Sequence, residues 1–134
     1  MATIRKFEDI EAWQEARKLN RLLFAATNTR GFRENFDIRG QLRGSSNSIM
    51  SNIAEGFERD GDREFRQFLS IAKGSVGELR SQLYGAMDSG LIPQETFDDL
   101  CGRATSVSRM IAGLMKYLST STIRGTKYKT RSIQ

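Results

Sequence analysis

The sequence of 134 residues contains no histidine, one cysteine and one proline. Histidine is the commonest general base and a frequent metal ligand, so its absence argues against most hydrolytic sites and against structural zinc. A single cysteine, Cys101, cannot form a disulfide within the chain, which fits a reducing cytoplasm. Scarce proline permits long helices. We therefore expect a protein that is not an enzyme and that has no catalytic residues, metal or cofactor.

Long apolar runs are also absent. None approaches the ~20 residues that a membrane-spanning helix needs, and the first residues lack the apolar stretch of a signal peptide. The length is typical of one domain, and 38% hydrophobic with 28% charged residues is ordinary for a globular protein. These features favour a cytoplasmic, single-domain protein without a membrane partner.

The charge is unbalanced toward lysine and arginine. The chain has 21 basic and 16 acidic residues, a net charge of +5, and its pI is about 9.7. Asp99 is the last acidic residue, and the basic residues that follow it are Arg103, Arg109, Lys116, Arg124, Lys127, Lys129 and Arg131. A basic balance favours anionic partners such as nucleic acid.

Apolar residues recur at three- and four-residue spacing in four segments, which is the period of amphipathic helices. We expect helices over residues 8–29, 35–58, 62–89 and 93–119, with Gly90 as a helix cap. Because the connections are short, consecutive helices must be antiparallel. The core of this bundle is expected to include Trp13, Leu19, Leu42, Ile49, Leu69, Val76, Leu83, Leu100 and Ile111.

The predicted fold is therefore all-α, an antiparallel up-down-up-down four-helix bundle over residues 1–119. From residue 120 to residue 134 the sequence is rich in Ser, Thr and basic residues and has no periodicity. Such composition is typical of a flexible tail.

Several basic residues are spaced as candidate phosphate contacts. Arg66, Lys73 and Arg80 are seven residues apart beside the apolar face of the third helix. The other candidates are Arg39 and Arg43 on the second helix, Arg59 and Arg63 around the next turn, and Lys127, Lys129 and Arg131 beside Tyr128 in the tail. A track of this kind could bind the phosphates of RNA. The alternative is that these cations lie on solvated faces and pair with Glu34, Asp62 or Glu64.

Other residues suggest contacts between subunits. Phe68 and Ile71 flank the apolar face of the third helix and make it wider than one bundle requires, while Gly74 and Ser75 permit close packing of another helix. We therefore place a subunit interface at these four positions. Glu55 and Glu78 could be paired carboxylates in a reaction, but polar groups satisfied within or between bundles, for example by Arg43 or Asn52, are the simpler interpretation.

Three strings within residues 7–83 resemble the four-helix-bundle family of 23S rRNA intervening-sequence proteins, which is related to the accessory variability proteins of diversity-generating retroelements. The strings are Phe7-x-Asp9-Ile10-x-x-Trp13-Gln14-x-Ala16, then Gln41-Leu42-Arg43 with Ser48-Ile49-x-x-Asn52-Ile53-Ala54-Glu55-Gly56, and Glu64-Phe65-x-x-Phe68-Leu69-x-Ile71-Ala72-x-Gly74-Ser75-x-x-Glu78-Leu79. The family usually has Leu-Arg-Arg-Ala-Ala where this chain has Leu42-Arg43-Gly44-Ser45-Ser46, so one expected cation is missing.

The resemblance implies a bundle that assembles into a ring, typically a homopentamer, and that accompanies structured RNA. Two functions follow from the residues and the resemblance together. The first is a non-catalytic, oligomeric scaffold that binds RNA through basic surfaces. The alternative is a protein-interaction module that supports a partner enzyme such as a reverse transcriptase.

Overall fold

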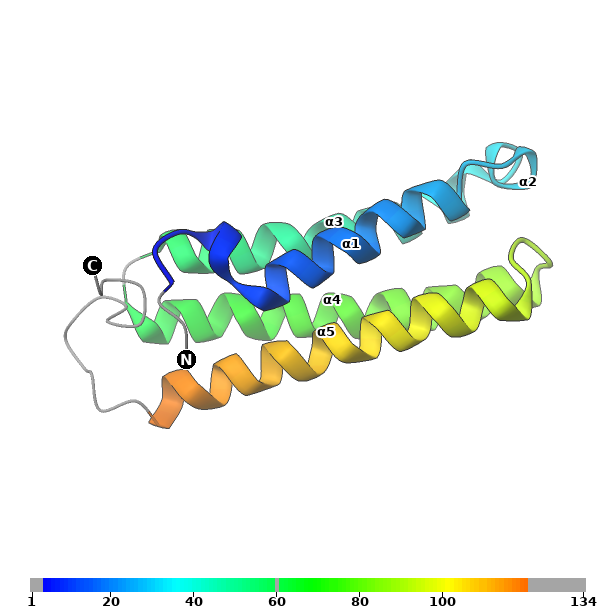
Figure 1. Cartoon of the computed structure of the whole chain (residues 1–134). Coiled ribbons are helices and arrows are strands. Elements are labelled where there is room, and N and C mark those ends of the chain that lie inside the picture. The colour runs from blue at the N-terminus through cyan, green and yellow to red at the C-terminus, as the bar shows by residue number, and fades with distance from the viewer. Residues whose placement is uncertain (1–3, 60, 121–134) are drawn as a thin grey trace.

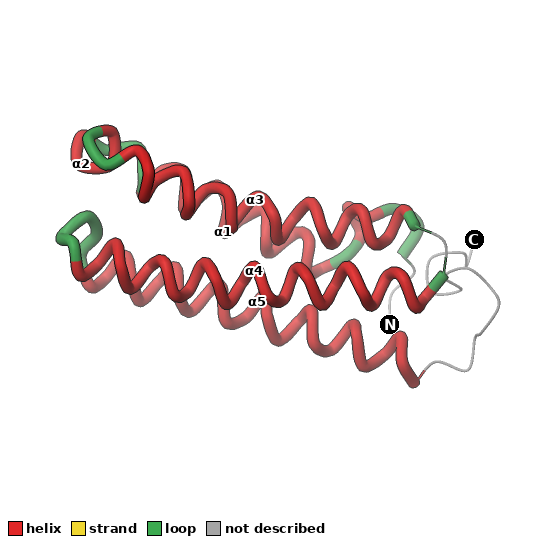
Figure 2. Tube along the Cα trace, turned by 180° about the vertical axis from the view of Figure 1, so that it is seen from behind, coloured by secondary structure: helices red, strands yellow, loops and turns green. Residues whose placement is uncertain are grey.

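A computed structural model describes residues 4–59 and 61–120. Within these ranges, all regular structure is helical (Figure 2). A 3-10 turn, η1, comes first, and the elements in chain order are η1 (Phe7–Asp9), α1 (Glu11–Ala26), α2 (Arg30–Arg33), α3 (Phe36–Glu58), α4 (Asp62–Asp88) and α5 (Gln94–Thr120).

The four long helices α1, α3, α4 and α5 lie side by side, and each runs antiparallel to the one before it (Figure 1). Around the bundle, α3 packs against α1 and α4, and α5 packs against α4 and α1. This arrangement confirms the predicted all-α, up-down-up-down bundle. None of the helices in the described ranges is both long enough and apolar enough to cross a bilayer.

The core follows the predicted periodicity closely in the second half of the chain. On α4 an apolar residue is buried at every third or fourth position, and these residues are Phe65, Leu69, Ala72, Val76, Leu79, Leu83 and Ala86. The buried residues of α5 are Phe97, Leu100, Ala104, Val107, Ile111, Leu114 and Leu118. Full burial of a leucine side chain stabilises the fold by about 1.5–3 kcal/mol, so these two stripes hold α4 and α5 in the bundle.

The first helix differs from the prediction. The segment expected as one helix over residues 8–29 begins as η1, and Ile10 then adopts an extended conformation (φ −77°, ψ 120°) before α1 starts at Glu11. The Asp9 carboxylate accepts hydrogen bonds from the backbone N–H of Arg5 (3.0 Å) and of Lys6 (3.2 Å), and these bonds cap the start of η1. The capped turn precedes Ile10 and is separate from α1.

Trp13 was expected in the core, and that expectation is wrong. The fully enclosed positions of this helical turn are Ala12 and Ala16, whereas Trp13 is only half-buried and packs against the edge of the core. The remaining predicted core residues are buried. A large ring at the rim of a helix pair keeps one side in contact with solvent.

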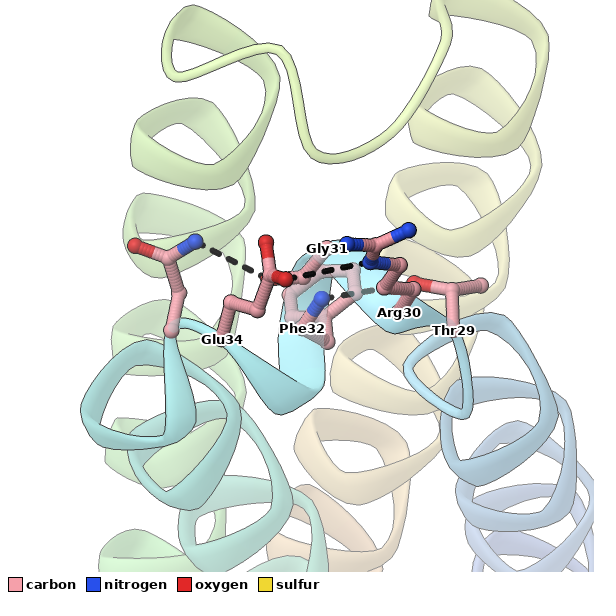
Figure 3. A network of polar contacts seen from close by, with 6 residues as sticks. Thr29, Arg30, Gly31, Phe32 and Glu34 are labelled. Atoms are coloured by element: carbon pink, nitrogen blue, oxygen red, sulfur yellow. Dashed lines mark hydrogen bonds and ion pairs between the residues drawn. The ribbon is translucent and has the colours of Figure 1, made fainter.

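A short helix, α2, occupies the connection between α1 and α3 (Figure 3). Thr29 caps it, since the Thr29 hydroxyl accepts a hydrogen bond from the backbone N–H of Phe32 at 3.4 Å. Arg30 and Glu34 form an ion pair across its outer face at 3.1 Å. The α1–α3 pair diverges from the α4–α5 pair toward this end (Figure 1), and the fully buried Phe32 ring lies there in the core.

The predicted cap at Gly90 is confirmed. Gly90 has a φ of 75°, which favours glycine. Its N–H donates to the Met87 carbonyl, and the Leu91 N–H donates to the Ala86 carbonyl, both at 2.9 Å. These two bonds satisfy carbonyl groups that the end of α4 would leave without partners. The last helix, α5, extends to Thr120, which is one residue into the segment expected as a tail.

Candidate nucleic-acid interface

The row formed by Arg66, Lys73 and Arg80 lies along α4 on the side that faces α5. Arg66 lines a hollow of about 300 Å³ together with Arg63, Gln67 and Met115 of α5, and the charge of Arg80 acts on Cys101 of α5. At 1.5 Å per residue, cations seven residues apart on a helix repeat every ~10 Å. We call Arg66, Lys73 and Arg80 the α4 cation row.

The α4 cation row is free of ion pairs with the acidic residues of the described ranges. Lys73 and Arg80 are exposed, while Arg66 is half-buried. The Nε atom of Arg66 is itself enclosed and has no hydrogen-bond partner among the described atoms. Arg63, also exposed and without an ion pair in the same ranges, lies one turn before Arg66. The carboxylates of the described residues therefore engage none of these four cations.

Arg59 and Arg43 are different, because each is held by its own chain. The Arg59 guanidinium pairs with Glu55 at 2.7 Å and with Glu64 at 3.9 Å, and it lies over the Phe68 ring at 5.0 Å from the ring centroid. The hydrogen bond with Glu55, and then the nearby carboxylates, raise the pKa of Arg59. The ion-paired alternative thus describes Arg59, although its main partner is Glu55.

Arg43 stacks on α1. Its guanidinium lies 4.4 Å from the Phe24 ring centroid and donates to the Thr27 hydroxyl (2.9 Å) and to the Phe24 carbonyl (3.2 Å). Burial, and secondarily the charge of Arg39, lower the pKa of Arg43. Arg43 therefore fixes α3 to the end of α1, and its donors are largely used inside the chain.

The acidic pair considered from the sequence does not form. Glu55 on α3 pairs with Arg59, which directly follows α3, rather than with Arg43 or Asn52 as suggested above. Glu78 is exposed on α4. The Asn52 side chain instead donates to the Ser48 carbonyl and hydroxyl at 2.8 and 3.0 Å. In the described part of the chain there is no cluster of three or more Cys, Asp or Glu side chains that could hold a metal ion.

The four residues placed at a subunit interface separate into two groups. Phe68 and Ser75 contact their own chain: the backbone at Gly56 packs against Phe68, and Ser75 is buried with its hydroxyl 2.8 Å from that of Ser48 on α3. Ser75 is thus buried within its own subunit, and its assignment to a subunit interface stays a prediction. Ile71 is 50% exposed, and Gly74 is exposed with no atom near its vacant side-chain position.

The tail residues Lys127, Lys129 and Arg131 lie outside the described residues, so their candidate role stays a prediction. Of the remaining candidates, Arg39 is half-buried on α3 near Arg43. Among the described candidates, Arg63 and the α4 cation row therefore lack ion pairs, Arg39 and Arg43 lie together on α3, and Arg59 is ion-paired.

The sequence interpretation missed a groove between η1, α1 and α3. It forms a hollow of about 340 Å³, and its lining residues are Phe7, Trp13, Asn47, Met50, Ser51 and Ala54. We call it the Trp13 groove. The spacing Trp13, Arg17, Asn20, Phe24 was the available signal, because residues three and four apart share one face of a helix. The groove was not predicted because Trp13 was expected to lie in the core.

Sequence and structure comparisons agree with this architecture. The pattern of the 23S rRNA-intervening sequence protein family matches residues 8–113. The chain belongs to this family. The match includes the α4 cation row and most of the Trp13 groove, but ends before the basic tail. No curated protein matches the chain.

A solved structure with a similar fold comes from Bacteroides thetaiotaomicron and is described as a protein of unknown function from the S23 ribosomal protein family. The TM-score is 0.72 at 18% identity, over 78% of this chain and 98% of that chain. At this identity the likeness establishes the fold alone. It supports the bundle and leaves the function to the residues of this chain.

Proposed function

We propose that this family member is a non-catalytic, oligomeric scaffold that binds structured RNA through charge, with little sequence preference. The observation that supports it most directly is the α4 cation row, whose three cations have no acidic partner in the described ranges. Cations held on one face of a rigid helix at regular spacing neutralise phosphates without ordering long flexible segments.

Assembly would strengthen this binding. One subunit with a net charge of +5 has a modest field, and a ring of several subunits repeats the cation row around its circumference. We propose a homopentamer, on the strength of the family resemblance and of the half-exposed Ile71 on α4. A cytoplasmic location would place such an assembly beside its RNA.

The experiment is fluorescence anisotropy of a labelled structured RNA across a salt series. If four to six phosphates in single-stranded parts of this RNA are engaged, the log–log slope of affinity against salt should be about −3 to −4, since each contact to a single strand contributes about −0.7. Arg66→Ala with Lys73→Ala removes two contacts and should reduce the magnitude of the slope by about 1.4 by the same rule. Removal of residues 121–134 should weaken binding and leave the fold intact.

A matched control removes the same charge from cations that are already paired. Arg30 pairs with Glu34 and Arg103 pairs with Asp99, each at 3.1 Å. Arg30→Ala with Arg103→Ala should therefore leave the slope closer to that of the unmodified protein. Absence of binding at low salt would contradict the proposal. Capture of a protein such as a reverse transcriptase, with RNA bound only in that complex, would support the interaction-module alternative.

A further inference from the structure

We propose that the Trp13 groove holds an unpaired nucleobase of RNA against the Trp13 ring, with Arg17 and Arg21 on the adjacent phosphates. This inference rests on the RNA-binding role proposed above and identifies where a base, as opposed to a phosphate, is contacted. Four features of the groove carry it: an oriented aromatic ring, an apolar floor, a pair of amides, and cations without acidic partners.

The aromatic ring is held in a defined orientation. Phe7 packs edge-on against Trp13, with ring centroids 5.1 Å apart and an interplanar angle of 66°. Met50 and Ala54 of α3 provide the apolar floor of the groove. Because Trp13 is half-buried rather than enclosed, a planar ligand can reach it from solvent. Stacking on a ring that is already ordered loses little conformational entropy on binding.

The amide pair supplies hydrogen-bonding groups at one side of the groove. The Asn20 amide nitrogen donates to the Asn47 side-chain oxygen at 2.7 Å and to the Met50 sulfur at 3.2 Å. The bond between the two amides uses the side-chain oxygen of Asn47 as its acceptor. The side-chain oxygen of Asn20 remains as an acceptor, and the side-chain nitrogen of Asn47 remains as a donor. The exposed edge of an unpaired base presents both donors and acceptors, which such a pair can meet.

The charges decide between RNA and an apolar protein segment as the occupant. The Arg17 guanidinium lies over the Trp13 ring, 5.8 Å from the ring centroid, so a base that stacks on this face would displace it toward the adjacent phosphate. Arg21 is exposed one turn further along α1. Neither forms an ion pair within the described ranges, whereas the neighbouring Lys18 pairs with Glu15 at 3.1 Å. An apolar segment would desolvate these two guanidinium groups without compensation, while a nucleotide brings its own phosphates to them.

The test uses the fact that Trp13 is the single tryptophan of the chain. The full-length protein is titrated with a short single-stranded oligouridylate at low salt, and tryptophan emission is followed. Stacked bases should quench the emission in a saturable manner. A fully base-paired RNA duplex of the same length should quench much less, because its bases are not available for stacking.

Substitutions then separate stacking from general binding. Trp13→Ala should weaken the affinity for a labelled oligouridylate by about 5- to 100-fold, which corresponds to the loss of one stacked base, and Trp13→Phe should retain most of it. Asn47→Ala, at an exposed position, should weaken binding about 2- to 10-fold. Phe36→Ala is the matched control, since Phe36 is 67% exposed and far along α3 from the groove; it should have no effect.

The outcomes distinguish this inference from the function on which it rests. If neither single-stranded nor structured RNA binds the unmodified protein, the proposed function fails. If RNA binds but does not quench Trp13, or if duplex quenches equally, the base site is wrong while the scaffold role stands. Should Trp13→Ala impair folding, as circular dichroism would reveal, the Asn47→Ala and Trp13→Phe results decide the question.

Discussion

Gly56 on α3 lies directly against Phe68 on α4. A Cβ atom at Gly56 would come within 2.7 Å of the Phe68 Cβ and within 3.3 Å of the Phe65 carbonyl oxygen. Because these neighbours are backbone or directly attached to it, they cannot rotate away. This contact sets how closely the C-terminal end of α3 approaches the start of α4.

The first prediction compares Gly56 with Gly74, which has no atom within 4 Å of its vacant side-chain position. Gly56→Ala should lower the free energy of unfolding by about 1–3 kcal/mol, as expected of overpacking. Gly74→Ala should raise it by up to about 1 kcal/mol, because alanine favours helix more than glycine does. Urea unfolding of both variants measures this, and equal effects would contradict the packing argument.

The second prediction concerns the adjacent serines of α3. Ser46 is fully buried and its hydroxyl has no hydrogen-bond partner among the described residues, whereas the Ser45 hydroxyl donates to Gln82 at 2.8 Å. Ser46→Ala should therefore stabilise the fold by about 1 kcal/mol or more, and Ser45→Ala should destabilise it by a similar amount. Thermal melts of the two variants should shift in opposite directions.

The third prediction addresses Arg43, whose planar guanidinium stacks on Phe24 and donates to Thr27. Arg43→Ala should reduce the free energy of unfolding by about 1–3 kcal/mol. Arg43→Lys should restore little of it, because an ammonium group cannot stack and donate in the same geometry. If the lysine variant is as stable as the unmodified protein, then a positive charge at this position is sufficient and the stacking argument is wrong.

The fourth prediction tests assembly. Ile71→Lys places a charge on the exposed face of α4 and should abolish a homo-oligomer that uses this face, while leaving the helical content unchanged. Gly74→Ala should weaken the same oligomer even though it stabilises the subunit. Light scattering at micromolar concentration reports the mass, and a monomeric mass for the unmodified protein would reject the proposed ring.

The fifth prediction is a pH dependence at Cys101 on α5. Burial is the main reason that the pKa of its thiol is raised, the charge of Arg80 opposes this, and Asp98 adds to it. Reaction with a thiol reagent should therefore be slower than for a free cysteine at the same pH and accelerate as the pH rises. Arg80→Ala should slow the reaction and Asp98→Asn should speed it.

The raised pKa of Cys101 also makes the stability of the folded protein depend on pH. The folded state keeps the Cys101 proton to higher pH than the unfolded chain does, so this contribution is complete below the unfolded pKa and is lost as the pH rises above it. Chemical unfolding at neutral and at alkaline pH, with Cys101→Ser as the reference, should show a decline in stability that the serine variant lacks.

Much of the fold could be predicted because it depends on local periodicity. The stripe from Phe65 to Ala86 and the positive φ of Gly90 follow from residues within one helix or one turn. The start of α1 could not be predicted in this way, because the apolar period continues through η1 although the extended backbone of Ile10 separates η1 from α1. Trp13 was misassigned for a related reason: periodicity places it on the right side of α1, but not at the right depth.

For the candidate site, too, some features follow from local spacing and others from tertiary contacts. The sequence by itself determined the helices, their order, the family and the regular spacing of the cations on α4, because these depend on spacing along one element. Only the tertiary structure decided that Arg43 is held by α1 and Arg59 by Glu55, and that Ser75 faces α3. It also decided that Trp13 and Asn47 line one groove, where Asn20 donates to the Asn47 side chain. The rotation and depth of each helix arise from contacts between elements, such as that of Gly56 with Phe68, and no periodicity within one helix encodes them.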